Sequence, residues 1–192
     1  PTMGAIHQGH ISLIEKSIYQ CKKTLVSIFI NKAQFDKKND YLSYPRLTNH
    51  DIKKLKNLKI NYLFMPMNKE IYPNGQNKNL KINSFAGKLC GKFRPGHFIG
   101  VVDVIDRFIK IINPNKIYLG KKDFQQLILI KDFIKKNKIK TKVISCNTIR
   151  EKNGIALSSR NYLLSLKQKK IASKVYKLLK NKKLLIKNKN KL

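Results

Sequence analysis

The chain opens with PTMGAIHQGHISLI, residues 1–14, in which two histidines flank a Gln-Gly pair just before a run of apolar residues. Ile11, Ile14 and Ile18 then recur at the spacing of one helix face. The first turn of a helix has backbone N–H groups without partners and carries the positive end of the helix dipole. The stretch therefore predicts a helix start that is suited to holding phosphate.

The H-x-G-H core of this stretch carries the candidate chemistry. Gly9 lacks the side chain that would keep a phosphate away from the backbone. His7 and His10 can donate hydrogen bonds to the negative charge that develops during phosphoryl or nucleotidyl transfer. The alternative is a capped helix with two surface histidines and no ligand, and the motif alone does not decide between the two.

Composition predicts one main domain with a small appendage, because 192 residues suffice to bury a sizeable core. The net charge of +32 suggests nucleic-acid binding at first sight. However, 37 of the 42 basic residues are lysine, and isoleucine (25) and asparagine (19) are also frequent. An A/T-rich coding sequence supplies these three residues readily, and the lysines are spread along the whole chain. We therefore attribute the charge to genomic bias and expect no specific nucleic-acid partner.

The three cysteines, Cys21, Cys90 and Cys146, are odd in number and show no C-x-x-C spacing. This pattern argues against a disulfide framework or a zinc site and favours a reducing cytoplasm. No apolar run approaches the roughly 18 residues that span a bilayer, and no signal peptide opens the chain. The chain begins inside a motif without a preceding strand, so we expect that its N-terminal residues are missing from the sequence.

Short apolar runs at residues 25–30, 62–65, 117–119 and 142–145 predict strands, and the first of them is rich in β-branched residues. Between them, helices are predicted from Thr48 or Asn49 as the cap, over residues 101–112, and from Asp123 as the cap. This alternation indicates an α/β fold, a parallel sheet with flanking helices. Beyond residue 166 one further helix is predicted, and we expect residues 181–192, which approach low complexity, to be solvated or frayed.

Ligands of parallel sheets bind beyond the carboxyl ends of the strands, where four polar segments of this chain are expected, one of them residues 148–151. Asn31 and Gln34 form an amide pair that could bind hydroxyls or a carboxylate, although such residues are also ordinary in loops. In residues 120–126, Lys122 offers a cation for phosphates, and Asp123 could accept from ribose or simply cap a helix. Residues 156–161 supply two hydroxyls and a guanidinium for the phosphates of a nucleotide.

The H-x-G-H turn with a late Ser/Lys/Arg loop resembles the HIGH-motif nucleotidyltransferase superfamily related to class I aminoacyl-tRNA synthetases. Within it, six ordered blocks resemble the pantothenate synthetases, or pantoate–β-alanine ligases. The blocks run from residue 1 to about residue 165 and read P-T-M-G-A-I-H-x-G-H, V-S-I-F-I-N-x-x-Q-F, Y-P-R, R-P-G-H-F-x-G-V, G-x-K-D-F-Q-Q and L-S-S-R-N.

The resemblance implies a cytoplasmic ATP-binding ligase of pantothenate and coenzyme A biosynthesis. Its members activate pantoate with ATP and Mg²⁺ as pantoyl-adenylate, releasing pyrophosphate, and the amine of β-alanine then displaces AMP. The family also implies a homodimer. It implies a Rossmann-like nucleotide-binding domain over residues 1–147, with its first strand missing. Residues 148–192 would hold the phosphate loop and a reduced, truncated C-terminal lobe.

Site roles are carried over by the resemblance. The implied catalytic residues are His10, as the proton donor, with His7, Lys122 and Arg160 on the phosphates. Gln34 and Gln126 would hold pantoate, with Asn31 beside them. The implied ATP-binding positions are Met3, Gly4, Ala5, Ile6, His7, Gln8, Gly9, His10, Gly120, Lys121, Lys122, Asp123, Ile149, Leu157, Ser158, Ser159 and Arg160.

The chain departs from the family pattern at several positions. Lys32 stands where proline is usual, so we expect the loop that follows to be less rigid. Lys121 and Asn39 stand at usually acidic positions, and Asp103 replaces a threonine on an otherwise apolar helix. We expect no metal site made by the protein, because ATP phosphates and waters can supply most of the Mg²⁺ shell. The one candidate ligand is Asp51, which matches a recurrent family acid.

Two alternatives remain at this point. A related nucleotidyltransferase would transfer AMP or CMP onto a phosphate ester, but the two glutamines and the R-P-G-H-F block argue against it. A basic nucleic-acid-binding module, eroded from an enzyme, would bind duplexes with strong salt sensitivity.

Overall fold

The computed structural model describes residues 1–189, with side chains described through residue 182. Helices and strands alternate along most of this length. In chain order, with η for 3-10 helices, the elements are α1 (Gln8–Gln20), β1 (Leu25–Ser27), η1 (Lys32–Gln34), α2 (Lys38–Leu42), α3 (Thr48–Asn57), β2 (Tyr62–Phe64), α4 (Asn68–Ile71), η2 (Ser84–Gly87), η3 (Leu89–Phe93), α5 (His97–Ile112), β3 (Lys116–Gly120), η4 (Lys121–Asp123), α6 (Phe124–Lys136), β4 (Lys142–Cys146), η5 (Ser159–Leu163) and α7 (Leu166–Lys189).

The strands form two parallel pairs, as the alternation predicts. β1 pairs with β2, with Leu25 opposite Tyr62, and β3 pairs with β4, with Lys116 opposite Lys142. Thr2 extends the first pair through a parallel bridge to Ile28. A parallel pair needs a long crossover connection, and helical segments provide it in both cases. The predicted α/β architecture with parallel strands is therefore confirmed.

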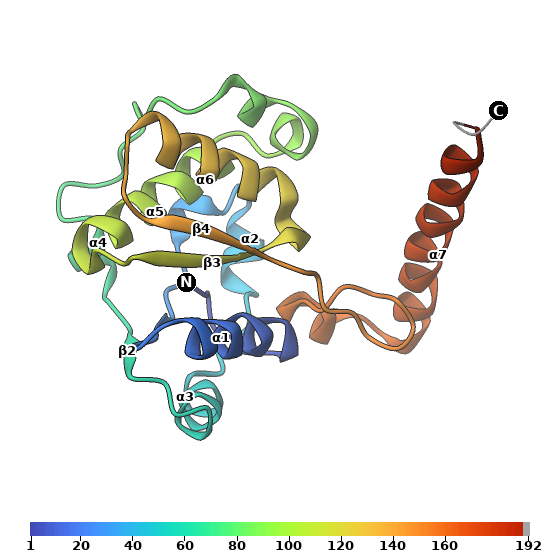
Figure 1. Ribbon diagram of the computed structural model, residues 1–192, viewed down its shortest axis with the longest axis horizontal. Coiled ribbons are helices and arrows are strands. Elements are labelled where there is room, and N and C mark those ends of the chain that lie inside the picture. Colours follow the sequence, from blue (N-terminus) through green and yellow to red (C-terminus); the bar gives the residue numbers. More distant parts are fainter. Residues whose placement is uncertain (190–192) are drawn as a thin grey trace.

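Helices cover both sides of the strands (Figure 1). The larger core joins α5 and α6 to β3, and it includes Val102 and Ile130, which are fully buried. A smaller core joins α1 and α3 to β1 through Ile14, Val26 and Leu55. The 16-residue α5 is apolar enough to be buried on most of its surface, which is why it lies at the centre of the larger core.

An acidic residue inside α5 is accommodated by pairing. Asp103, 2% exposed, accepts a hydrogen bond from the Arg107 Nε at 2.8 Å and one from the Asn77 backbone N–H at 3.0 Å. Burying a carboxylate is costly unless it is paired and hydrogen-bonded. The departure from the family pattern at this position thus ties α5 to the segment that follows α4.

One helix cap predicted from sequence is wrong, and a second is confirmed in position but makes no capping hydrogen bond. α3 begins at Thr48 itself, with Leu47 in the cap position and no side-chain capping bond, so neither Thr48 nor Asn49 is the cap. Asp123 does occupy the cap position of α6 but makes no capping hydrogen bond. Its carboxylate lies 3.5 Å from the Lys122 Nζ instead. Both side chains that the pattern assigned to local capping are thus available for other contacts.

The C-terminal segment leaves the two cores after β4. A bridge between Arg150 and Ala156 closes a turn, and α7 then projects away from the rest of the molecule (Figure 1). The Arg150 guanidinium lies 3.8 Å from the centre of the Tyr176 ring and ties the turn to α7. Helix α7 continues to Lys189, beyond the point where we expected fraying, and residues 190–192 of that expectation lie outside the described residues.

Within residues 1–189, no helix combines the length and the apolar character needed to cross a bilayer. A groove of about 710 Å³ separates the two parallel pairs. Ser27 from β1 and Ile117 from β3 line it, and the buried Ser27 hydroxyl has no hydrogen-bond partner among the described residues.

Candidate active site

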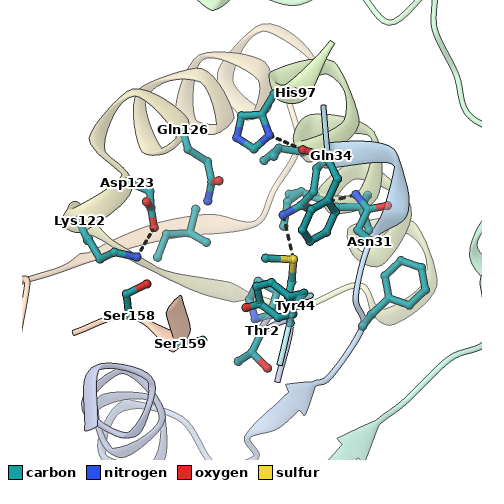
Figure 2. Close-up of a pocket in the computed structure, with 18 of the residues that line it drawn as sticks. Thr2, Asn31, Gln34, Tyr44, His97, Lys122, Asp123, Gln126, Ser158 and Ser159 are labelled. Carbon is teal, nitrogen blue, oxygen red and sulfur yellow. Dashed lines mark hydrogen bonds and ion pairs between the residues drawn. The ribbon is translucent and has the colours of Figure 1, made fainter. Parts of the chain in front are cut away.

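A second, smaller cavity of about 220 Å³ lies at the carboxyl ends of the strands (Figure 2). It is formed by the segments that follow Thr2, β1 and β3, together with α5 and the start of η5. These segments meet because carboxyl ends of parallel strands share one edge. The lining residues are Pro1, Thr2, Met3, His7, His10, Phe29, Asn31, Gln34, Phe35, Tyr44, Arg94, His97, Val101, Val104, Ile105, Phe108, Leu119, Lys122, Asp123, Gln126, Ser158, Ser159 and Arg160.

The two histidines of the H-x-G-H turn cap α1 reciprocally. His7 occupies the N-cap position, and its Nδ1 accepts a hydrogen bond from the Gly9 N–H at 3.1 Å. The His10 Nδ1 accepts one from the His7 N–H at 3.4 Å, and the two rings stack with centroids 4.0 Å apart. Because both Nδ1 atoms accept, the Nε2 atom of each ring carries the hydrogen.

Burial keeps these imidazoles neutral at physiological pH. Desolvation is the largest cause and, with the nearby His7 and Lys122, lowers the pKa of His10 to about 3. Desolvation and Lys122 also lower the pKa of His7. A neutral ring with Nδ1 occupied offers one donor, the Nε2–H group. The two histidines therefore act as hydrogen-bond donors to an incoming anion.

The role expected of Gly9 differs from the one observed. Its N–H donates to the His7 Nδ1 within the cap of α1, and its expected backbone contact with phosphate stays a prediction. A Cβ atom at Gly9 would lie 2.8 Å from the His7 ring, closer than Cβ atoms pack. The glycine is thus required by the position of the imidazole. The donors that face the cavity are side-chain groups.

The amide pair after β1 divides into one buried and one accessible residue. Asn31 is 1% exposed, and its Nδ2 donates to the Gly100 carbonyl at 3.0 Å and to the Gln34 Oε1 at 3.2 Å. Its Oδ1 accepts from the Tyr72 hydroxyl at 2.8 Å and from the Ala33 N–H at 3.3 Å. All polar atoms of Asn31 are thus used by the protein. The structure thus gives Asn31 the task of holding the loop, and its contact with substrate stays a prediction.

The backbone of Gln34 is fixed from the other side by a chain of three residues. The His97 Nδ1 donates to the Gln34 carbonyl at 2.6 Å, and the His97 Nε2 accepts from the Arg94 guanidinium at 3.0 Å (Figure 2). Arg94 in turn pairs with Asp36 at 2.9 Å. Burial lowers the pKa of His97, in keeping with a neutral ring. The Gln34 Nε2 lies 3.0 Å from the Met3 sulfur, which places this amide at the cavity.

Lys122 and Gln126 approach the cavity from the carboxyl end of β3. Lys122 is exposed, with Asp123 as its carboxylate neighbour at 3.5 Å. Gln126 lies on the first turn of α6, and its side chain points into the space between Lys122 and Gln34 (Figure 2). The predicted cation and both predicted glutamines therefore share one cavity.

The start of η5, together with its cap Ser158, closes the cavity on the side of α1. The Ser159 hydroxyl donates to the Ala5 carbonyl at 3.2 Å, which joins η5 to the H-x-G-H segment across the chain. Arg160 forms a two-point ion pair with Asp40, at 2.7 and 3.0 Å, and lies 5.2 Å from the Tyr44 ring centre. The hydrogen bond to Asp40 raises the pKa of Arg160. The guanidinium is thus held at the rim of the cavity.

Not every residue implied by the resemblance reaches the cavity. Met3, His7, His10, Asn31, Gln34, Lys122, Asp123, Gln126, Ser158, Ser159 and Arg160 line it. Gly4, Ala5 and Ile6 are buried beneath it. Lys121 turns away and donates to the Asn147 side chain at 2.9 Å. Contacts of Gln8, Gly9, Gly120, Lys121, Ile149 and Leu157 with ATP stay predictions.

Asp51, the one residue considered as a magnesium ligand, is buried and bonded to the backbone. No group of three or more His, Cys, Asp or Glu side chains in this part of the chain could hold a metal ion. Asp51 is 1% exposed, and its two oxygens accept the N–H groups of Ala5 and Ile6, each at 2.7 Å. Both oxygens are therefore engaged by backbone amides.

Comparison with known sequences places this site in a family. Residues 1–191 match the family described as pantoate-beta-alanine ligase. The chain belongs to this family. The pantothenate synthetase of Francisella philomiragia subsp. philomiragia is 46% identical over 180 residues, which are 93% of this chain and 69% of that protein. The pantothenate synthetase of Thermodesulfovibrio yellowstonii is 41% identical over 180 residues, which are 94% of this chain and 64% of that protein.

Solved structures of pantoate-beta-alanine ligases share the fold. The Francisella tularensis enzyme, complexed with beta-gamma ATP and beta-alanine, gives a TM-score of 0.86 at 45% identity, over 94% of this chain and 69% of that one. Pantothenate synthetase from Thermus thermophilus gives 0.88 at 35% identity, over 92% of this chain and 64% of that one. The family resemblance and the Rossmann-like fold class are therefore confirmed.

Three polar residues of this pantoate-beta-alanine ligase site were missed as site residues. Tyr44, Arg94 and His97 line the cavity, although they stand inside the Y-P-R and R-P-G-H-F blocks. The blocks themselves were a signal that these side chains have a task. The apolar wall was also missed, because the α5 residues that form it read from sequence as core alone.

Proposed function

We propose that this chain ligates pantoate to β-alanine at the expense of ATP, through pantoyl-adenylate, with release of pyrophosphate and AMP. Family membership supports the reaction. The observation that supports this reaction in the present chain is that one cavity contains both the groups for binding phosphate and the groups for binding pantoate. The same cavity of about 220 Å³ is lined by the donors directed at phosphate and by the two glutamines. The donors are His7, His10 and Lys122, and the glutamines are Gln34 and Gln126.

The cavity has two walls of different character. Its polar wall holds the histidines, Lys122 and the serines, whereas Val101, Val104 and Phe108 form an apolar wall. Pantoate carries two methyl groups beside its hydroxyl and carboxylate, so it suits a site with one apolar and one amide-bearing side. We assign Gln34 and Gln126 to its polar groups, and the α5 side chains to its methyl groups.

The first step joins a pantoate carboxylate oxygen to the α-phosphorus of ATP, while the bond from that phosphorus to the bridging oxygen of pyrophosphate breaks. Negative charge develops on the phosphoryl and leaving oxygens, and fixed donors stabilise it. The neutral Nε2–H groups of His7 and His10 supply such donors without a proton-transfer step, and Lys122 supplies the cation. Ser158, Ser159 and Arg160 would hold the departing phosphates.

The second step forms the amide. The amine of β-alanine attacks the acyl carbonyl of the adenylate, loses a proton, and expels AMP. No covalent enzyme intermediate is needed, which agrees with a cavity whose reactive side chains are donors. We assign Gln34, whose side-chain amide lies beside Met3, to the side of pantoate that faces β-alanine.

Further elements of the proposal come from the family and from the charge of the substrates. Mg²⁺ would arrive with ATP, held by phosphates and water, because the described residues form no ligand set for it. We propose a homodimer working in the cytoplasm, with residues 1–147 as the nucleotide-binding domain and residues 148–192 as the phosphate-loop segment.

A two-part assay tests the proposal. The purified chain should exchange labelled pyrophosphate into ATP only with pantoate, and should release AMP only with pantoate and β-alanine together. His10→Ala and Lys122→Ala should lose pyrophosphate exchange, whereas Lys131→Ala, an exposed lysine on α6 outside the cavity, should keep the parent rate. Exchange at the parent rate in either cavity variant would refute the assigned roles. AMP transfer to a phosphate ester would favour a related nucleotidyltransferase.

A further inference from the structure

Asp51 is the most deeply buried carboxylate near the site that the proposed reaction does not use. It lies in the first turn of α3, outside the cavity lining. Its Oδ2 accepts the Ala5 N–H and its Oδ1 accepts the Ile6 N–H, both at 2.7 Å. Hydrogen bonds to an ionised acceptor are shorter and stronger than neutral ones. The Asp51 carboxylate therefore binds the backbone of the turn through both of its oxygens.

The backbone that Asp51 holds is in an unfavourable conformation. Gly4 and Ala5 both have left-handed dihedral angles, with φ of +80° and +49°. A residue with a Cβ atom adopts this region at a cost, whereas glycine does not. A Cβ atom at Gly4 would lie 3.1 Å from the Asp51 Oδ2, so the carboxylate is seated against the turn. The strained peptide persists because the surrounding contacts fix it.

This turn carries the groups that face the phosphates. Ile6 is followed directly by His7, the cap of α1, and the Ile6 carbonyl accepts from the Lys54 Nζ at 2.6 Å. The Ala5 carbonyl accepts from the Ser159 hydroxyl at 3.2 Å. The N–H groups of Ala5 and Ile6 therefore contact α3, and the Ala5 carbonyl contacts the phosphate-loop segment at Ser159. A shift of Ala5 would move the imidazoles and Ser159 together.

We propose that Asp51 is a positioning residue for the adenylation step, whose carboxylate pins the Gly4–Ile6 turn and thereby sets His7, His10 and Ser159 around the phosphates. This inference rests on the proposed function. It assigns Asp51 a contact with the backbone of the turn, in place of the magnesium-ligand role for which the sequence made it a candidate.

Asp51→Asn is the first test, because the amide keeps the shape but turns an NH₂ group toward one of the two N–H donors. We expect kcat for pantoate-dependent pyrophosphate exchange to fall about tenfold or more, which corresponds to about 1.4 kcal/mol. KM for pantoate and the Mg²⁺ concentration at half-maximal rate should stay at the parent values. Asp132→Asn is the control, since Asp132 pairs with Lys136 on α6, outside the cavity lining.

Two further measurements keep the test decisive. Ala5→Gly in the Asp51→Asn background should recover at least threefold of the lost rate, because glycine adopts the left-handed conformation without strain. In the ligand-free protein, Asp51→Asn should shift the ¹H–¹⁵N resonances of the two site imidazoles, and the Asp132→Asn control should leave them unchanged. This spectrum tests the contact even if the parent chain shows no exchange activity, so failure of the proposed function is separately visible.

The proposal is overturned by any of three results. One is a parent rate in Asp51→Asn. Another is a rate that excess Mg²⁺ restores, which would make Asp51 a metal ligand. The third is imidazole resonances that do not move. If Asp51→Asn does not fold, the double variant with Ala5→Gly must fold and show the shifted resonances, and its failure to do so counts against the proposal.

Discussion

Gly100 is predicted to control the position of the glutamine loop from the opposite side. It lies in α5, packed against η1, and its carbonyl accepts from the Asn31 side chain at 3.0 Å. A Cβ atom there would lie 2.3 Å from the Ala33 oxygen and 3.0 Å from the Gln34 nitrogen. Ordinary Cβ contacts begin at 3.4 Å, so Gly100→Ala requires a displacement of about 1 Å. The displaced atoms are backbone atoms of the loop that carries Gln34.

The two effects of Gly100→Ala differ greatly in size. Overpacking costs about 1–3 kcal/mol, and replacing glycine by alanine within a helix returns about 1 kcal/mol, so folding should weaken by about 0–2 kcal/mol. A misplacement of about 1 Å at a reacting group costs on the order of 100-fold in rate. We therefore expect pantoate-dependent pyrophosphate exchange to fall far more than stability does.

Exchange kinetics at saturating ATP, measured together with urea unfolding, check this prediction. Gly87→Ala is the matched control, because a Cβ atom at Gly87 meets nothing within 4 Å, and it should keep both properties. The reasoning is refuted if Gly100→Ala exchanges at the parent rate, since the loop would then tolerate the displacement or take no part in binding pantoate.

Three further outcomes are expected. The pKa of His10 is lowered to about 3 from an ordinary 6.5, so between these pH values the unfolded chain binds a proton that the folded chain does not. The contribution of His10 to the free energy of unfolding should therefore be full above pH 6.5 and fall toward pH 3 by at most about 1.4 kcal/mol per pH unit. Urea unfolding at a series of pH values should show this slope in the parent chain and a flatter one in His10→Gln. Tyr72→Phe removes the hydroxyl donor to Asn31, so unfolding free energy should fall by about 1 kcal/mol and KM for pantoate should rise; an unchanged KM would separate this contact from binding. Arg160→Lys loses the two-point pair with Asp40, and KM for ATP should rise about tenfold in steady-state assays; a lower KM would mean that Asp40 withholds the guanidinium from ATP.

The sequence determined the periodic elements and the chemical character of their ends. The helical spacing of apolar residues in α5 and the short apolar runs at β3 and β4 predict these elements, because the residues that must be buried recur with the period of the element. The residue types of the site, two histidines, a lysine, two glutamines and a Ser-Ser-Arg loop, were also readable, because phosphate and carboxylate binding require donors of those kinds.

The tertiary structure decided what each polar group bonds to. The sequence offered the amides of the α1 start to phosphate, but the Gly9 amide is taken by His7 within its own cap. It offered Asn31 to substrate, but the Asn31 amide is consumed by partners that lie as many as 69 positions away. Spacing along the chain cannot show these bonds, since they form between segments that meet only when the chain folds. The same holds for Asp51, whose carboxylate reaches across 46 positions to hold Ala5. Residue type sets which chemistry is available, and three-dimensional packing sets which atoms remain free to perform it.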